Sequence, residues 1–518
     1  MSIDLRPQTP PAPLTLGAIA AACDLTTDSP QIAVTGVTHD SRAVREGDLF
    51  AALPGEHAHG ATYAEQARAR GAVAVLTDAA GVEIIRASGL PVLVAADPRE
   101  SLGAVAAEVY GHPARDLLLI GVTGTNGKST TVHLLEAGLQ AAGHRTGIIG
   151  TTGVRIADRD VPNDRTTPEA PDLHALLARM REEGVTAVAM EVSSHALVLG
   201  RVNGLVCDYA IFTQLTQDHL DFHGTMEDYY AAKADLFTAA RARQAVIGVD
   251  GMWGRRLADH CEIPHISYAL DHDADVVCAS VLTHPTGQTL TVRDDALPGD
   301  AGATFDIEVG LPGRFNAANA LGAWAALRAS GVLPAVLSTA FAEVRVPGRM
   351  EIIDEGQDFS AIVDYAHSPD AVERVICAVI PRADSRRIVV LGCGGDRDRD
   401  KRFAMGDVAA AGADVLIVTD DNPRSEDPAA IRAAMLAGAH SVGGDIREIG
   451  DRREAIAAAV ALAGSGDVLL VLGKGHEPGQ ESAGVITPFD DRAELRAALR
   501  TKLGGSADPA AIRRGSPA

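Results

Sequence analysis

The sequence predicts an α/β protein of three domains with a phosphate-binding loop in the middle one. At 518 residues the chain is too long for a single hydrophobic core. Short apolar runs typical of buried strands alternate with helical patterns along most of it. One apolar run, 117–120, leads into Gly121-Val122-Thr123-Gly124-Thr125-Asn126-Gly127-Lys128-Ser129-Thr130, after which three leucines share one helical face. Strand, glycine-rich turn and helix in this order are the setting of a phosphate-binding loop.

Composition excludes several classes of protein. A formal net charge of −23 argues against binding to nucleic acid or to an anionic membrane surface. Because no run of 18 apolar residues exists, we expect no membrane insertion. The six cysteines form no C-x-x-C pair, and the proline-rich start does not resemble a signal peptide. These features predict reduced thiols and a cytoplasmic protein.

The first part of the chain predicts a tail followed by a small α/β domain. Residues 1–13 are proline-rich and are expected to be disordered. Between residues 14 and 113, four short apolar runs alternate with two helical patterns, at 63–70 and 98–109. The polar loop at 38–42 follows a strand. It would either bind a small molecule or only cap turns.

The second domain, residues 114–345, contains the phosphate loop. Its glycines allow backbone N–H groups to converge on an anion, and the following helix adds the partial positive charge of its N-terminus. Lys128 would reach the β- and γ-phosphates, and the Ser129 hydroxyl would bind Mg²⁺. Val122 stands where the usual G-x-x-x-x-G-K-[ST] pattern has glycine, so a merely structural turn remains the alternative.

Polar residues follow two further strands of this domain. The apolar run 185–190 ends at Glu191, placed where a Mg²⁺ ligand belongs beside a phosphate loop. The run 209–212 leads into a polar loop with Asp218 and His219, which would serve a metal or cap a helix. Lys233 lies on a mostly apolar helical face. Such a lysine either extends to water or, if buried near a metal, needs a partner or a modification.

The rest of the second domain is predicted to be β-rich over residues 263–312. An alanine-rich helix follows, in which Asn316 and Asn319 share one face because they are three residues apart. Turn residues at 345–349 then mark the next boundary.

The third domain, residues 346–503, has the alternation of a Rossmann-like fold. Strands are expected at 361–363, 388–391, 415–418 and 468–472, with helices at 369–379 and 428–437. Ligands bind at the strand ends of such sheets, and polar residues gather there: Asp364, His367, Asp396, Arg397, Asp421, Asn422, Arg424, Lys474, His476 and Glu477. Residues 504–518 are expected to form a second tail.

Taken together, these motifs resemble those of the Mur ligases, the ATP-dependent amide-forming enzymes of peptidoglycan precursor synthesis. The resemblance covers nearly the whole chain. It rests on Asp40-Ser41-Arg42 with Gly47-Asp48-Leu49-Phe50, Thr123 to Thr130, Met190 to His195, Asp218 to Asp221, Tyr230 to Lys233, Gly313 to Asn319, Gly348 to Glu351 and Asp364 to His367. Val122 agrees with the phosphate-loop motif of this family.

The resemblance implies addition of the third peptide residue to UDP-N-acetylmuramoyl-L-alanyl-D-glutamate through an acyl phosphate, with ATP and Mg²⁺ as cofactors. Asp421-Asn422-Pro423-Arg424 is similar to the motif of the enzymes that add meso-diaminopimelate. A guanidinium can bind the second carboxylate of this amino acid through two hydrogen bonds. The lysine-adding homologue, folylpolyglutamate synthetase and a P-loop switch remain the alternatives. The enzyme is expected to act as a monomer.

The resemblance also implies a function for individual residues. Lys128, His219 and a carbamylated Lys233 would be catalytic, and Ser129, Glu191, His219 and Lys233 would serve Mg²⁺. ATP would meet Thr123, Gly124, Thr125, Asn126, Gly127, Lys128, Ser129, Thr130, Asn316, Arg349 and Asp364. The UDP substrate would meet His39, Ser41, Glu56, His57, Ala58, Thr166, Thr167, Ser193 and Arg201. Diaminopimelate would meet Arg397, Asp421, Asn422, Pro423, Arg424, Gly473 and Glu477. At Leu199 the chain departs from many relatives, which have a substrate-contacting glutamine there.

Overall fold

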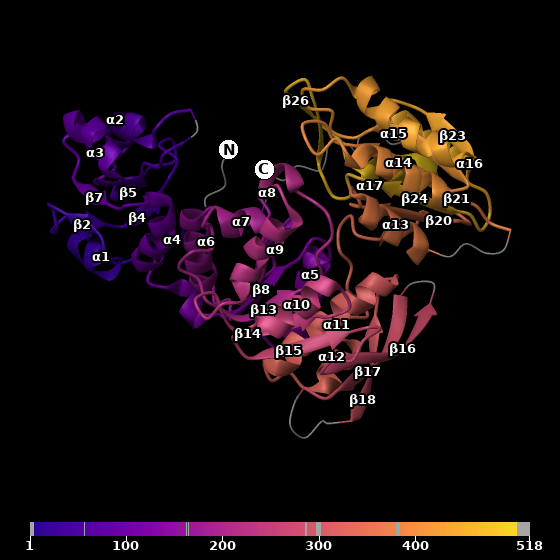
Figure 1. Cartoon of the computed structure of the whole chain (residues 1–518), viewed down its shortest axis with the longest axis horizontal. Coiled ribbons are helices and arrows are strands. Elements are labelled where there is room, and N and C mark those ends of the chain that lie inside the picture. The colour runs from indigo at the N-terminus through magenta and orange to yellow at the C-terminus, as the bar shows by residue number, and fades with distance from the viewer. Residues whose placement is uncertain are drawn as a thin grey trace.

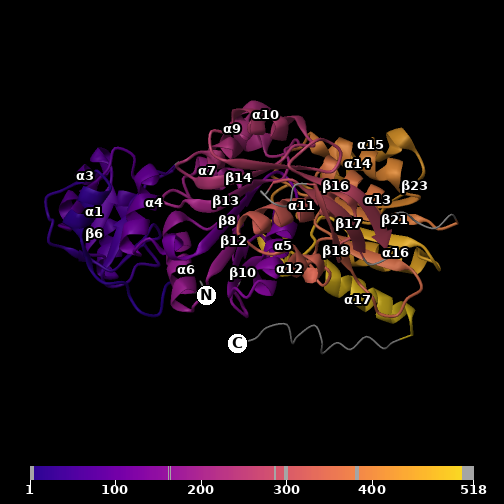
Figure 2. The ribbon, with the colours of Figure 1, turned by 90° about the horizontal axis from the view of Figure 1, so that it is seen from below.

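Three α/β domains follow one another along the long axis of the molecule, in chain order (Figures 1 and 2). This is the predicted architecture. The computed structural model describes residues 5–55, 57–161, 163, 165–284, 287–296, 302–379 and 384–504. No helix within these ranges is both long and apolar enough to cross a bilayer.

The first domain is built on a five-stranded sheet of order β2-β7-β6-β5-β4. Its four neighbouring strands β4 to β7 are parallel, and β2 is antiparallel at the edge. The strands are β2 (Thr26–Thr27), β4 (Gly36–Thr38), β5 (Asp48–Ala51), β6 (Ala74–Thr77) and β7 (Val92–Val94), beside a pair formed by β1 (Leu14–Thr15) and β3 (Ala33–Val34). The helices are α1 (Leu16–Ala22), α2 (Ala64–Ala69), α3 (Ala79–Ile85) and α4 (Pro98–Val109).

The central domain carries an eleven-stranded sheet of order β11-β10-β9-β12-β8-β13-β14-β15-β16-β17-β18. The middle strands are parallel and almost entirely buried, as expected when helices cover both faces. They are β9 (Thr146–Gly150), β12 (Ala187–Glu191), β8 (Leu118–Thr123), β13 (Cys207–Phe212), β14 (Ala242–Gly248) and β15 (His265–Ala269). The flanking strands are β10 (Gly153–Ile156), β11 (Arg159–Val161), β16 (Val276–His284), β17 (Gly287–Asp294) and β18 (Ala303–Val309).

Eight helices described in this part of the chain surround the central sheet. α5 (Lys128–Ala141) and α11 (Arg314–Ala329) pack together over one face, around the fully buried Trp324. The others are α6 (Ala170–Glu182), α7 (Ser194–Val198), α8 (Leu220–His223), α9 (Met226–Ala234), α10 (Met252–His260) and α12 (Pro334–Ala340).

The third domain has a six-stranded sheet of order β19-β20-β24-β21-β22-β23. All its strands are parallel except β19 at the edge. They are β19 (Glu351–Ile352), β20 (Ser360–Asp364), β24 (Val468–Leu472), β21 (Arg387–Cys393), β22 (Val415–Asp420) and β23 (Asp445–Glu448). The helices are α13 (Pro369–Ala378), α14 (Lys401–Gly412), α15 (Pro428–Val442), α16 (Arg452–Leu462) and α17 (Asp491–Lys502), and β25 (Gly479–Ser482) pairs with β26 (Val485–Pro488).

Strand order in the third sheet fixes where a ligand would bind. β24 lies between β20 and β21. The helices that follow β20, β21 and β22 pack together on one face, whereas the helix that follows β24 packs with α16 on the other, so the connections leave the sheet toward opposite faces at this point. Such a switch point opens a crevice beyond the carboxyl ends of the strands. The segments that begin there are 365–367, 394–397, 421–424 and 473–477.

The expectation of a disordered N-terminal tail is wrong for residues 5–9. Arg6 forms a 2.8 Å ion pair with the buried Asp48 of the first domain. The backbone amides of Gln8 and Thr9 donate to the carboxylate of Glu182, at the end of α6 in the central domain. These polar contacts, which proline content does not reveal, hold the segment across two domains. Residues 1–4 and 505–518 lie outside the described residues.

Candidate active site

The phosphate loop connects β8 to α5. Gly124 and Gly127 have φ values of 147° and 90°, a region that side-chain-bearing residues rarely adopt. A Cβ atom at Gly127 would also lie 2.3 Å from Oδ1 of Asn319 on α11. The loop therefore needs glycine at both positions, and it presents the N-terminus of a 14-residue helix to an anion.

Two lysines hold the same loop carbonyl from different elements. Nζ of Lys128 donates to the carbonyl oxygens of Gly124 and Thr125, at 3.0 and 2.9 Å. Nζ of Lys233, on α9, donates to Gly124 at 2.9 Å and lies over the ring of Tyr229. Lys233 is 1% exposed, and burial, with the neighbouring charge of Lys128, holds its pKa well below the usual value. It does not extend to water.

A cavity of about 740 Å³ opens in front of the loop. Arg349 reaches into it from the third domain, where its guanidinium donates to Oγ of Ser129 at 3.2 Å and stacks on the Tyr365 ring. Nine of the residues predicted to meet ATP line the cavity: Thr125, Asn126, Gly127, Lys128, Ser129, Thr130, Asn316, Arg349 and Asp364. Thr123 and Gly124 do not line it. Thr123 is fully buried within β8.

Glu191 ends β12 beside the loop, as its position in the sequence predicts. Its carboxylate accepts from the backbone amide and the hydroxyl of Thr151, which follows β9, at 2.8 and 3.1 Å. Its backbone carbonyl accepts from the Thr167 hydroxyl, which in turn accepts from the amide of Ser193. A carboxylate held in this way keeps a fixed position on the cavity wall.

His219 lies on the same wall, in a left-handed conformation with φ 54°. It packs edge-on against His195, and burial lowers its pKa to about 4. Its neutral imidazole is the form that binds a metal. Within the described residues, no three His, Cys, Asp or Glu side chains form a ready-made metal cluster.

These residues still fit a nucleotide with Mg²⁺. A hydroxyl from Ser129, a fixed carboxylate from Glu191 and a neutral imidazole from His219 face one cavity. Oxygen donors with water and phosphate are what Mg²⁺ prefers. The side-chain nitrogen and oxygen of Gln214 and Nε of Arg349 are buried and have no hydrogen-bond partner in the described part of the chain. Both residues line this cavity.

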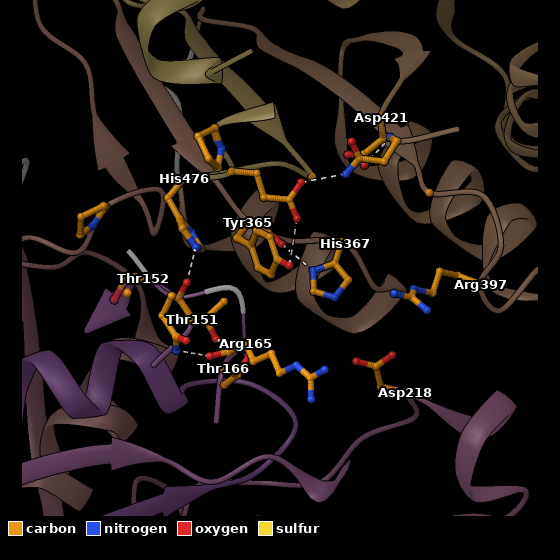
Figure 3. Close-up of a pocket in the computed structure, with 18 of the residues that line it drawn as sticks. Thr151, Thr152, Arg165, Thr166, Asp218, Tyr365, His367, Arg397, Asp421 and His476 are labelled. Carbon is orange, nitrogen blue, oxygen red and sulfur yellow. Dashed lines mark hydrogen bonds between the residues drawn. The ribbon is translucent and has the colours of Figure 1, made fainter. Parts of the chain in front are cut away.

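A second cavity, of about 980 Å³, lies between the central and third domains (Figure 3). It is lined by six residues predicted to meet diaminopimelate: Arg397, Asp421, Asn422, Arg424, Gly473 and Glu477. Pro423 does not line it. The two cavities share a wall made of Thr151, Thr166, Asp218, His219, Tyr365 and His367.

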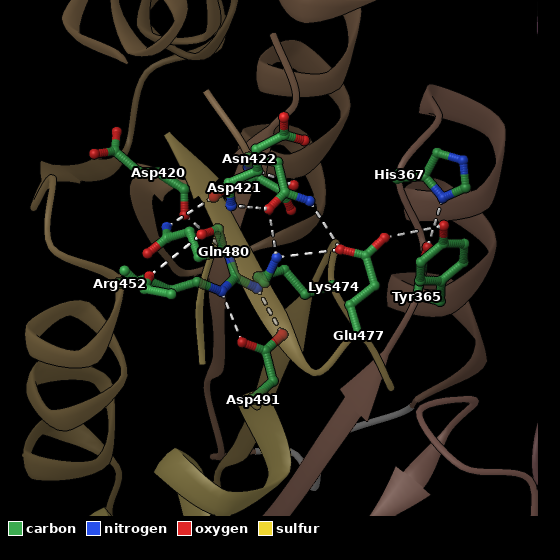
Figure 4. A network of polar contacts seen from close by, with 12 residues as sticks. Tyr365, His367, Asp420, Asp421, Asn422, Arg452, Lys474, Glu477, Gln480 and Asp491 are labelled. Carbon is green, nitrogen blue, oxygen red and sulfur yellow. Dashed lines mark hydrogen bonds and ion pairs between the residues drawn. The ribbon is translucent and has the colours of Figure 1, made fainter. Parts of the chain in front are cut away.

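A hydrogen-bonded network fixes Glu477 at this cavity (Figure 4). Its carboxylate accepts from Asn422 at 2.8 Å, from the buried Lys474 at 3.1 Å and from the Tyr365 hydroxyl at 3.3 Å. Arg452 and Asp491 form a fully buried ion pair beside this network. Arg452 also donates to the carbonyl of Leu472 in β24.

Arg424 is held in a left-handed conformation, with φ 52°. Its amide donates to the carbonyl of Glu481 in β25, and its carbonyl accepts from Ala483. Its guanidinium donates to the carbonyl of Gly395 at 2.7 Å and lies 3.4 Å from the Glu481 carboxylate. The hairpin β25–β26 therefore fixes the direction of this side chain into the cavity.

The residues predicted to meet the UDP substrate are spread over two domains. Thr166 and Ser193 line the cavities, whereas Arg201 forms a 2.9 Å ion pair with Glu169. In the first domain, the Ser41 hydroxyl donates to Gln66, and Nδ1 of His39 is buried with no partner among the residues that the structure describes. His39, Ser41, His57 and Ala58 line neither cavity, and Glu56 lies outside the described residues.

Three contacts went unrecognised in the sequence. They are the bonds from Thr151 to Glu191, from Tyr365 to Glu477, and from Asn126 in the loop to Asp370 on α13, at 3.4 Å. Thr151 was open to prediction, because it directly follows the apolar run of β9 and strand-end residues meet at one edge of a parallel sheet.

Comparison with known proteins identifies the family to which the chain belongs. Models described as the Mur ligase middle domain, the Mur ligase glutamate ligase domain and the Mur ligase family catalytic domain match residues 122–327, 348–475 and 33–110. A protein of Streptomyces coelicolor named UDP-N-acetylmuramoyl-L-alanyl-D-glutamate--2,6-diaminopimelate ligase is 53% identical over 478 residues, covering 91% of this chain and 93% of its own. The chain belongs to the Mur ligase family.

Other Mur ligases agree in sequence and in fold. A UDP-N-acetylmuramyl-tripeptide synthetase of Leifsonia xyli is 43% identical, with 96% of this chain and 98% of its own covered. A solved structure of a UDP-N-acetylmuramoyl-L-alanyl-D-glutamate--2,6-diaminopimelate ligase superimposes with a TM-score of 0.67 at 33% identity. The match covers 95% of this chain and 100% of the other.

Proposed function

We propose that this Mur ligase uses ATP to join an amino group of meso-2,6-diaminopimelate to the D-glutamate carboxyl group of UDP-N-acetylmuramoyl-L-alanyl-D-glutamate. This is a step of peptidoglycan precursor synthesis. The observation that carries the proposal is the wall shared by the two cavities. It supports the proposal because the cavity lined by Arg424 and Glu477 adjoins the cavity lined by the phosphate loop.

The reaction divides into two transfers. The γ-phosphate of ATP passes to a carboxylate oxygen of D-glutamate and gives an acyl phosphate and ADP. The amine then attacks the acyl carbon, a tetrahedral intermediate forms, and the carbon–oxygen bond to phosphate breaks. The first transfer brings two anions together, which the ammonium of Lys128 and the N-terminus of α5 stabilise. When bound, Mg²⁺ would be held by Ser129, Glu191 and His219 and would offset the same repulsion.

Lys233 is proposed to be carbamylated. A neutral amine is the form that adds CO₂, and burial favours that form here. The product carries a negative charge, which suits a position near a metal, whereas an ammonium would repel it. The addition forms a bond from Nζ to the carbon of CO₂ and releases one proton. The carbamate nitrogen keeps one N–H, which can still donate to the Gly124 carbonyl oxygen, 2.9 Å from Nζ.

Diaminopimelate is proposed to bind between three segments of the third domain. Arg424 and Arg397 would hold the distal carboxylate, and Glu477 with Asp421 would receive the distal ammonium. L-Lysine lacks that carboxylate, so it would form no ion pair with Arg424 or Arg397 at this end. This argues for diaminopimelate over lysine.

The UDP part of the substrate is proposed to lie against the first domain, near His39 and Ser41, with the peptide reaching the cavities past Thr166, Thr167, Ser193 and Arg201. Nδ1 of His39 is buried and has no hydrogen-bond partner among the described residues, and a ligand would supply one. We further propose that the enzyme works as a monomer in the cytoplasm.

The test is a panel of amino acids in a phosphate-release assay with ATP and the UDP-dipeptide. Release that needs both the UDP-dipeptide and meso-diaminopimelate is the expected result. A preference for L-lysine would assign the lysine-adding reaction instead. Release that needs neither substrate would indicate a nucleotide-driven switch and overturn the ligase proposal.

A further inference from the structure

The short loop Gly473–Glu477 contacts both reaction centres. It begins where β24 ends, at the carboxyl edge of the third sheet. Its glycines have φ values of 117° and 55°, and a Cβ at Gly475 would lie 2.8 Å from the carbonyl oxygen of Gly348. The loop is therefore fixed in place. Its two consecutive side chains have different partners: His476 contacts Thr151 (Figure 3), and Glu477 contacts Asn422 and Lys474 (Figure 4).

His476 connects the third domain to the central one. Its Nε2 lies 2.9 Å from the backbone carbonyl oxygen of Thr151, and burial, with the charge of Arg349, lowers the pKa of the imidazole. A neutral ring that donates from Nε2 satisfies this contact. The amide and hydroxyl of the same Thr151 donate to the Glu191 carboxylate. One threonine thus lies between His476 and the acid of the nucleotide cavity.

Glu477 makes the second connection. It accepts from Tyr365, whose ring carries the guanidinium of Arg349 at 4.4 Å, and Arg349 donates to Ser129 of the phosphate loop. Glu477 also faces the amino-acid cavity, where Asn422 and Lys474 hold it. Both paths run from the amino-acid site to a residue proposed to hold Mg²⁺.

We propose that His476 is a positioning residue that joins the amino-acid loop to Thr151 and thereby fixes Glu191 for phosphoryl transfer only when the third domain is closed. This rests on the proposed function above. His476 does not touch the reacting atoms. Its contact makes the position of Glu191 depend on the third domain, so acyl phosphate formation depends on closure of the domain that carries the amino-acid site.

The test separates phosphoryl transfer from binding. Positional isotope exchange in ¹⁸O-labelled ATP, with the UDP-dipeptide and no amine, reports reversible acyl phosphate formation. His476→Leu is expected to slow this exchange about tenfold, the effect of one lost hydrogen bond near the upper end of its usual contribution. The dissociation constants of a non-hydrolysable ATP analogue and of diaminopimelate, measured by calorimetry, should change less than threefold. kcat therefore falls while KM hardly moves.

Two further variants make the result specific. His476→Gln retains a donor at a similar distance along the side chain and should recover most of the exchange rate, which a general packing defect would not allow. His440→Leu changes an exposed histidine on α15 of the same domain and should behave like the wild type.

Wild-type exchange by His476→Leu overturns the proposal, as does His476→Gln that is as slow as His476→Leu. Failure of the proposed function looks different, because the wild-type enzyme itself would then show no release of phosphate dependent on the UDP-dipeptide and diaminopimelate.

Discussion

We propose that Arg424 determines which amino acid the enzyme uses. Arg424→Ala removes the guanidinium proposed to bind the distal carboxylate. We expect kcat/KM for diaminopimelate to fall on the order of a hundredfold. The low rate with L-lysine should stay the same, because lysine has no carboxylate there. Steady-state phosphate release measures both.

Arg447→Ala is the control for this change, because Arg447 pairs with Asp445 on the edge strand β23 and lines neither cavity. Equal losses for lysine and diaminopimelate in Arg424→Ala would mean that the residue only supports the fold.

Lys233 gives a chemical prediction. Lys233→Ala should lose activity, because no carbamate can form, and a short carboxylate such as acetate or propionate should restore part of it by entering the space of the lost side chain. The measurement is phosphate release against carboxylate concentration. Absence of rescue at every chain length would count against carbamylation, and Lys128→Ala, which loses a cation, should not respond to carboxylate at all.

Residue chemistry was easier to predict than residue contact. Local sequence patterns were enough to single out Lys128, Ser129 and Glu191. The first two begin a helix after a glycine-rich turn, and Glu191 ends a strand. The bond from His476 to Thr151 joins residues 325 positions apart, and no local pattern carries that information.

At the scale of elements, the buried pair of Arg452 and Asp491 ties α16 to α17. Asp491→Ala leaves a guanidinium with 0% side-chain exposure and no carboxylate partner. Such a change typically costs about 3–5 kcal/mol. Hydrogen exchange of peptides from 452–503 should show the loss as faster opening of both helices.

Glu494→Ala, on the same helix, removes the partner of the largely exposed Arg453 and should cost no more than about 1 kcal/mol. If both variants exchanged equally fast, the buried pair would not be what holds α17.

Elements with a clear apolar period were predicted well. The expected strands at 388–391 and 468–472 are β21 and β24, and the helix expected at 98–109 is α4. Others were missed for physical reasons. β25 and β26 have four residues each, and in neither do apolar and polar residues alternate. The parallel order of the third sheet depends on crossovers that periodicity does not encode.

At the scale of the molecule, the site is divided between domains. We expect scattering profiles to show a smaller radius of gyration when an ATP analogue, the UDP-dipeptide and diaminopimelate are all present, because the ligands bridge the central and third domains. Superimposable profiles with and without these ligands would contradict domain closure.

The N-terminal segment gives a second prediction at this scale. Deleting residues 1–9 removes Arg6 from Asp48 and the two amides from Glu182. Without this connection the first domain should move more freely, so KM for the UDP-dipeptide should rise severalfold while KM for ATP stays nearly constant. Deleting only residues 1–4 leaves these contacts in place and is the matched control; equal effects of both deletions would refute this function of the segment.

The shared wall of the two cavities has a consequence for inhibition. Because Thr151, Thr166, Asp218, His219, Tyr365 and His367 face both spaces, the proposed nucleotide site and the proposed amino-acid site are adjacent. A single compound that joins a phosphinate to a diaminopimelate-like arm could therefore occupy both spaces at once. Such a molecule would make the contacts of two ligands while losing the translational and rotational entropy of only one. Resistance would require changes in residues that both reactants contact.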